Sequence, residues 1–219
     1  MNKRSNQLRS KKRVNDHGEV FTSEQEVNAM LDLVKHETEN IESRFLEPAC
    51  GNGNFLSEVL RRKMEIVTYR YKKSQTEWER YALIALTSVY GIDILSDNVN
   101  ECRDRLLKQF MVEYKSHYKS KCKESFPKAA YFILKQNILL GNALTLKTKE
   151  GDPLIFSEWS SVSRGFVKRR DFKMEELLNK EADLFSDLGL GVFIPQPVAE
   201  YPLIHILKLM EYDTTNLQS

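Results

Sequence analysis

Two acidic residues, each at the end of a predicted buried strand, are the side chains best placed to bind a small molecule. Glu47 follows Phe45 and Leu46, and Asp93 follows the apolar run Val89–Ile92. Carboxylates accept hydrogen bonds from hydroxyl groups and attract cations. Because open α/β sheets bind ligands at the carboxyl ends of their strands, we expect both carboxylates to line one site.

The turn after Glu47 has the residues that a close ligand approach requires. Gly51 and Gly53 permit positive φ and leave room for a ligand, because they have no Cβ. Asn54 is a good N-cap for the following helix, whose first N–H groups would point into the turn. The sequence therefore predicts a strand, a tight turn and a helix around a binding site.

The charges of this segment favour a cationic ligand over a phosphate. A dinucleotide-binding fingerprint would have a third glycine at position 56, which is Leu56, and the chain has no Gly-Lys-Ser/Thr loop. Glu47 would also repel a pyrophosphate. S-adenosylmethionine, with its ammonium and sulfonium groups, suits an acidic site.

The run Glu47-Pro-Ala-Cys-Gly-Asn-Gly-Asn-Phe-Leu56 resembles cofactor motif I of adenine-specific N-6 DNA methyltransferases of restriction–modification systems, especially the type IIG enzymes. The resemblance implies an α/β fold: the Rossmann-like sheet of class I S-adenosylmethionine-dependent methyltransferases, with helices on both faces. It also implies an adenine-specific DNA methyltransferase activity with S-adenosylmethionine as cofactor. The cofactor-binding residues that it implies in this segment are Glu47, Pro48, Ala49, Gly51, Gly53, Asn54 and Phe55.

A second segment, before motif I, resembles motif X of the same family. It contributes Val20, Phe21 and Thr22 to the implied cofactor site, although the family usually has proline where Ser23 stands. A capping box, from Thr22 with Gln25 or Ser23 with Glu26, is expected to start a helix there. We expect this segment to form the second wall of the pocket.

Motifs II and III complete the implied cofactor site. Asp93 and Ile94 match motif II, whose acid accepts the ribose hydroxyls. Asn142 and Ala143 occupy the place of motif III, where the family has an aspartate that accepts the adenine amino group. An amide oxygen can also accept that bond, so we expect weakened cofactor binding, with adenine between Ile94 and Ala143.

Composition sets broad limits on the protein. The 219 residues suffice for one ordinary domain, or one domain and an appendage, and the net charge of +2 does not by itself imply a polyanionic partner. Three cysteines without Cys-x-x-Cys spacing, no secretory leader and no apolar run of membrane-spanning length indicate a cytoplasmic protein with reduced thiols. The scattered histidines predict no metal site.

We divide the chain into a basic flexible arm (1–14), a cofactor-binding domain (15–150) and an appended β-hairpin with helices (151–219). The arm could follow DNA phosphates or be a tail without function. Residues 113–128 alternate lysines and tyrosines, which suits either nucleic-acid binding or a solvated helix. The hairpin, with strands at 154–159 and 166–172, would carry a basic edge that contacts DNA through Lys168, Arg169 and Arg170.

The family's catalytic motif IV, Asn/Asp/Ser-Pro-Pro-aromatic, is missing, because the sequence has no Pro-Pro. The resemblance therefore implies an incomplete C-terminal half and no catalytic residue in this chain. Three interpretations follow: the cofactor-binding part of a split methyltransferase whose second chain carries motif IV, acting on double-stranded DNA; a non-catalytic cofactor-binding or regulatory module; or a methyltransferase for another substrate. We favour them in that order.

Overall fold

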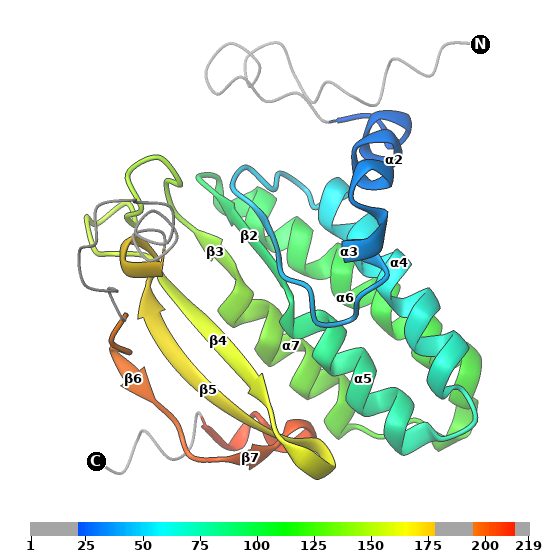
Figure 1. Cartoon of the computed structure of the whole chain (residues 1–219). Helices are drawn as coiled ribbons and strands as arrows, with labels where there is room; N and C mark the ends of the chain where they lie inside the picture. Colours follow the sequence, from blue (N-terminus) through cyan, green and yellow to red (C-terminus); the bar gives the residue numbers. More distant parts are fainter. Residues whose placement is uncertain (1–21, 178–194, 213–219) are drawn as a thin grey trace, which may run out of the picture.

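Two β-sheets, one parallel and one antiparallel, and a group of long helices make up the chain (Figure 1). The computed structural model describes residues 22–177 and 195–212. The predicted arm, residues 1–14, lies outside these residues. The structure has the predicted α/β class, with a parallel sheet in the segment before residue 150.

The parallel sheet holds the two acidic residues at the same edge. Its strands are β1 (Phe45–Glu47), β2 (Val89–Asp93) and β3 (Ile138–Leu140), in the order β1-β2-β3. Glu47 is level with Gly91, and Asp93 is level with Leu140. The carboxyl ends of all three strands thus lie together, as the sequence predicts.

The two faces of β2 have different neighbours. A Cβ on Gly91 would lie 2.9 Å from Leu56 Cδ1, so helix α4 (Asn54–Tyr71) packs closely on this face. Tyr90 points to the opposite face, where its hydroxyl donates to Ser157 O of the second sheet at 2.9 Å. The second sheet therefore packs on the parallel sheet at Tyr90 of β2.

The remaining helices extend the apolar core. They are α2 (Glu24–Leu33), α3 (Lys35–Thr38), α5 (Gln75–Thr87), α6 (Ser96–Tyr118) and α7 (Ser125–Asn137). Trp78 and Cys102 are fully buried in this core. None of the described helices combines the length and the apolar character that a membrane crossing needs.

The hairpin predicted after residue 150 forms a sheet of its own. Its strands are β4 (Ile155–Ser161), β5 (Phe166–Lys173), β6 (Ala199–Glu200) and β7 (Ile204–His205), all paired antiparallel. Within the described residues it shares no strand pairing with the parallel sheet, so it is not an extension of that sheet. Asn137, the last residue of α7, connects the two sheets: its Oδ1 accepts from Trp159 Nε1 of β4 at 2.9 Å, and its Nδ2 donates to Val89 O of β2 at 3.1 Å. A helix follows β5 from Met174 and is described as far as Leu177.

Candidate functional site

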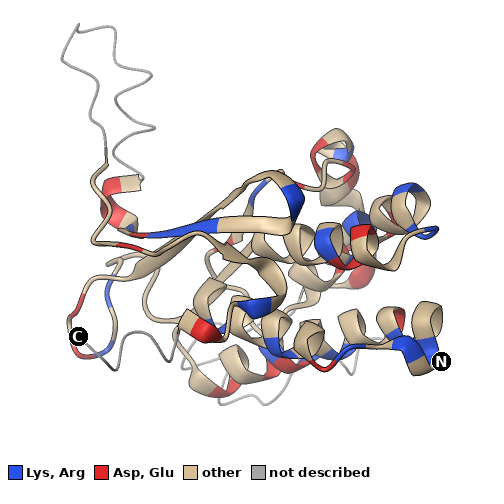
Figure 2. Ribbon diagram, turned by 90° about the horizontal axis from the view of Figure 1, so that it is seen from below, with Lys and Arg blue, Asp and Glu red and all other residues tan. Residues whose placement is uncertain are grey.

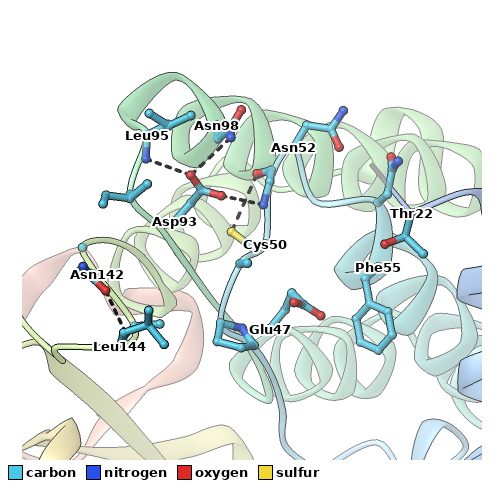
Figure 3. Close-up of a pocket in the computed structure, with 17 residues that line it drawn as sticks. Thr22, Glu47, Cys50, Asn52, Phe55, Asp93, Leu95, Asn98, Asn142 and Leu144 are labelled. Carbon is cyan, nitrogen blue, oxygen red and sulfur yellow. Dashed lines mark hydrogen bonds between the residues drawn. The ribbon is translucent and has the colours of Figure 1, made fainter. Parts of the chain in front are cut away.

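A cavity of about 540 Å³ lies where the three parallel strands end, a size typical of small-molecule sites. Segments after β1, β2 and β3 form its walls. In Figure 3, Asp93 stands on one side, Thr22 and Phe55 stand on the other, and Glu47 lies between them. Its lining residues are Thr22, Glu47, Pro48, Ala49, Cys50, Gly51, Asn52, Asn54, Phe55, Asp93, Ile94, Leu95, Asn98, Gly141, Asn142, Ala143 and Leu144.

The turn between β1 and α4 depends on its two glycines. Gly51 and Gly53 have φ of 51° and 83°, the left-handed conformation that glycine adopts without strain. A Cβ on Gly53 would lie only 2.8 Å from Cys102 Sγ of α6, so this turn packs directly on that helix. Cys50 N donates to Ile92 O at 2.9 Å and fixes the turn to β2.

The predicted cap of α4 is wrong by one residue. Gly53 is the N-cap, without a side-chain hydrogen bond, and Asn54 is the first helical residue. Asn54 Oδ1 instead accepts from Arg105 Nη1 of α6 at 2.7 Å. Asn54 therefore lines the cavity, and its side chain is held there by Arg105 and not by a capping hydrogen bond.

Asp93 joins all three walls of the cavity. Oδ2 accepts from Gly51 N at 2.9 Å, and Oδ1 accepts from Leu95 N at 2.8 Å and from Asn98 Nδ2 at 3.3 Å. Its backbone carbonyl accepts from Gly141 N at 2.9 Å. An ionised carboxylate has about four lone-pair sites, so one acceptor site remains for a ligand.

Glu47 gives the cavity its second carboxylate. It is half-buried, and desolvation raises its pKa, against the opposing hydrogen bond from the Ala49 backbone. No lysine or arginine is among the described residues that line the cavity. The site therefore favours a cationic or hydrogen-bond-donating ligand and repels a phosphate.

The third wall is the turn after β3. Asn142 Oδ1 accepts from Leu144 N at 2.8 Å and from Thr145 N at 3.4 Å. Asn142 N donates to Lys147 O at 2.9 Å, which closes the turn. The amide oxygen that we expected to meet the adenine amino group is thus engaged within the protein.

The wall predicted before motif I is described in part. Thr22 lines the cavity, while Val20 and Phe21 lie outside the described residues. Ser23 and Glu26 form the capping box of α2: Ser23 Oγ accepts from Glu26 N, and Glu26 Oε2 accepts from Ser23 N at 2.9 Å. Of the two capping boxes that the sequence allows, Thr22 with Gln25 and Ser23 with Glu26, the structure has the one between Ser23 and Glu26.

The structure brings most predicted site residues together around this cavity. Those that line it are Thr22, Glu47, Pro48, Ala49, Gly51, Asn54, Phe55, Asp93, Ile94, Asn142 and Ala143, whereas Gly53 is buried against Cys102 of α6. The lining also includes six residues that were not predicted: Cys50, Asn52, Leu95, Asn98, Gly141 and Leu144. Asn98 could have been predicted from its position, one helical turn before Cys102 on the apolar face of α6. A buried amide on such a face requires a polar partner.

The basic edge predicted on β5 has to be corrected at Arg169. This side chain is 6% exposed, its guanidinium pairs with Asp171 Oδ2 at 2.6 Å, and it lies 4.2 Å from the Tyr201 ring centroid. Lys168 and Arg170 are less buried and pair with Glu200 and Glu158, each at 2.6 Å. Over the other described elements, basic and acidic residues are interspersed (Figure 2). On β5 each of the three consecutive cations is paired with a carboxylate, so the strand presents no strip of unpaired positive charge.

The chain matches no family model, no curated protein and no solved structure. What the site can bind is therefore inferred from its chemistry. It combines two carboxylates, amide side chains, apolar surface from Phe55 and Ile94, and a turn rich in glycine. That set suits a cationic molecule with an apolar or aromatic portion.

Proposed function

We propose that this chain binds S-adenosylmethionine and is the cofactor-binding part of a DNA adenine N-6 methyltransferase of a restriction–modification system. The observation that carries the proposal is a cavity at the carboxyl ends of parallel strands with Glu47 and Asp93 in its lining. A ligand with ammonium and sulfonium groups gains from both carboxylates, whereas a nucleotide phosphate does not. The Rossmann-like methyltransferase fold belongs to this proposal.

Each wall has a role in holding the cofactor. Asp93 offers its remaining acceptor site to a ribose hydroxyl, and Ile94 and Ala143 flank the nucleobase. The Gly51–Gly53 turn allows the ligand close to the backbone, and Glu47 faces positive charge. When bound, S-adenosylmethionine supplies an electrophilic methyl group, and the chain's contribution is to position it for in-line transfer.

We further propose that a second chain supplies the catalytic Asn-Pro-Pro-Tyr loop and that double-stranded DNA is the substrate. Two observations support a second chain: the sequence lacks Pro-Pro, and β1 is paired on one side only within the described residues. Leu46 on β1 is 40% exposed. An edge strand with an exposed leucine offers backbone and apolar groups to an incoming strand.

Isothermal titration calorimetry with S-adenosylmethionine tests the cofactor assignment. We expect the wild-type chain to bind S-adenosylmethionine and to bind ATP much more weakly, because the carboxylates would repel its phosphates. Tritiated methyl transfer to DNA tests the division between two chains, and we expect none from this chain alone. Failure to bind S-adenosylmethionine would overturn the proposal, while robust transfer by the isolated chain would overturn the split arrangement.

The missing motif IV also favours a second candidate, a non-catalytic cofactor-binding or regulatory module. The two candidates differ once a methylase chain that carries Asn-Pro-Pro-Tyr is added. A split enzyme gains transfer activity that requires Asp93 of this chain. A regulatory module changes the rate of a partner that is already active on its own.

A further inference from the structure

We propose that Asn142 reads the nucleobase as a hydrogen-bond donor, through Nδ2, so that the ligand must present an acceptor there. This inference rests on the proposed function. It differs from the expectation drawn from the family resemblance, in which an acid at this place accepts the adenine amino group. Asn142 would then select nucleobases that have a hydrogen-bond acceptor at this position, and not those that have an amino group there.

The position of the amide oxygen follows from the turn after β3. Oδ1 accepts from Leu144 N and Thr145 N at 2.8 and 3.4 Å, an arrangement in which asparagine caps its own turn. The two N–H donors occupy both lone pairs of the carbonyl oxygen. The opposite orientation would point the amide N–H groups at two backbone N–H groups, so the chemistry fixes which atom is oxygen.

The backbone around Asn142 holds this orientation. Asn142 N donates to Lys147 O, and Gly141 N donates to Asp93 O, each at 2.9 Å. A Cβ on Gly141 would lie 2.5 Å from Leu154 Cδ2, so the turn has no room to shift inward. Rotating the side chain would leave the Leu144 and Thr145 N–H groups without their acceptor.

Nδ2 is therefore the polar atom that Asn142 offers to a ligand. It makes no hydrogen bond within the part of the chain that the structure describes, and the half-buried side chain lines the cavity. Figure 3 shows Asn142 beside Leu144 on the same side of the cavity as Asp93. A donor in a partly desolvated site gains from an acceptor on the ligand.

Adenine has such an acceptor next to its amino group. On that edge, N1 accepts and the C6 amino group donates. Ile94 and Ala143 are in the lining with Asn142, so a base between them can bring this edge to the amide. We assign N1 as the atom that pairs with Nδ2.

The test compares two neutral-sulfur ligands by calorimetry: S-adenosylhomocysteine and its 1-deaza analogue, in which a C–H group replaces N1. The wild-type chain should bind the analogue roughly tenfold more weakly, the usual effect of one lost hydrogen bond. In Asn142→Asp, one carboxylate oxygen can keep the turn while the other faces the ligand as an acceptor for the amino group. That variant should bind the two ligands with similar affinity, and the exposed control Asn100→Asp should behave as wild type.

The outcomes separate this inference from the proposed function. If the wild-type chain binds both ligands equally well, Asn142 does not read N1, although the cofactor assignment stands. If it binds neither of them nor S-adenosylmethionine, the cofactor assignment fails and this inference fails with it. A tenfold loss that persists in Asn142→Asp would show that another donor reads N1. If that variant does not fold, equal binding of the two ligands by the wild-type chain still overturns the inference.

Discussion

The N–H of Gly51 donates to Oδ2 of Asp93 at 2.9 Å and joins residues 42 positions apart in the sequence. The bond fixes the glycine turn after β1 to the end of β2. The other carboxylate oxygen accepts from the start of α6. One 8% exposed carboxylate thus organises the cavity before any ligand enters it.

Replacing Asp93 should therefore reduce both stability and ligand affinity. Asp93→Ala removes three acceptor contacts and leaves N–H groups at Gly51 and Leu95 unpaired, so we expect a loss of about 2–3 kcal/mol in the free energy of unfolding. S-adenosylmethionine binding should also be largely lost. Denaturant unfolding and calorimetry measure the two effects, with the exposed Asp104→Ala on α6 as control. Unchanged affinity would exclude Asp93 from ribose binding.

Glu47 should make cofactor binding depend on pH. Its pKa is raised by burial, so the unliganded protein holds the proton more tightly than the unfolded chain does. The Glu47 contribution to stability therefore falls as pH rises from the ordinary value of 4.5 through the raised pKa. A cationic ligand favours the carboxylate, so affinity should rise with pH over the same interval.

Glu47→Gln tests this assignment. It should remove that pH dependence and weaken S-adenosylmethionine binding by roughly tenfold at neutral pH, because a charged contact is lost. Calorimetry across the interval measures it, and Glu150→Gln, at an exposed position, is the control. An unchanged affinity profile would mean that Glu47 does not face the positive charge of the ligand.

Lys63 should stabilise the segment that leads into β1. It is fully buried, and its Nζ donates to the carbonyls of Asn40, Ile41 and Ser43. Lys63→Met would leave these three acceptors without a donor, and we expect a loss of about 3 kcal/mol in the free energy of unfolding. Lys108→Met, at an exposed position on α6, should have little effect.

The pH dependence of that loss has a defined sign. Burial lowers the pKa of Lys63 from 10.5 to about 7, so between these values the unfolded chain binds more protons than the folded chain. Wild-type stability should then rise with pH over this range relative to Lys63→Met, by at most about 1.4 kcal/mol per pH unit. If the difference in the free energy of unfolding between wild type and Lys63→Met stays constant over this pH range, the three carbonyls keep the Lys63 amine charged.

The sequence predicts the parallel strands and the position of the site because these features depend on local patterns. Apolar runs that end in Glu47 and Asp93, and glycines at a turn, determine where strands stop and a ligand can approach. The oxygen of Asn142 could not be assigned in this way. Whether an amide turns toward its own backbone or toward a ligand depends on the geometry of the turn, which the residue types leave open.

Another difference has an identifiable cause. Arg169 was assigned to a basic edge from its charged neighbours, although strand alternation places it on the same face as the buried Val167 and Asp171. The alternation of side chains along β5 therefore predicts the burial of Arg169, whereas the charge of its neighbours does not.

Arg169 should contribute to stability and not to DNA binding. Arg169→Met leaves Asp171 buried without its cation, so we expect a loss of about 3–5 kcal/mol in the free energy of unfolding. Asp171→Leu added to that variant should recover part of the loss, because the unpaired charge is removed. Lys168→Met is the exposed-pair comparison and should cost less than about 1 kcal/mol. This assignment would be contradicted if Arg169→Met kept wild-type stability and bound DNA more weakly in fluorescence anisotropy.

Two glycines with left-handed backbones offer a matched test of the turn that forms the cavity. Gly53 has φ of 83° and Gly151 has φ of 96°, so alanine is strained at both positions by about 1–2 kcal/mol. They differ in their surroundings: a Cβ at Gly53 would lie 2.8 Å from Cys102 Sγ and 3.3 Å from Cys102 Cα, whereas nothing lies within 4 Å of a Cβ at Gly151.

Gly53→Ala should consequently lower the free energy of unfolding more than Gly151→Ala, since the turn must also move away from α6. Because Gly51 lies in the same turn and donates to Asp93, that movement should weaken S-adenosylmethionine binding as well. Gly151→Ala should lose stability through backbone strain alone and keep wild-type affinity. Equal stability losses in the two variants, with affinity unchanged in both, would show that the contact between Gly53 and Cys102 does not hold the turn in its binding position.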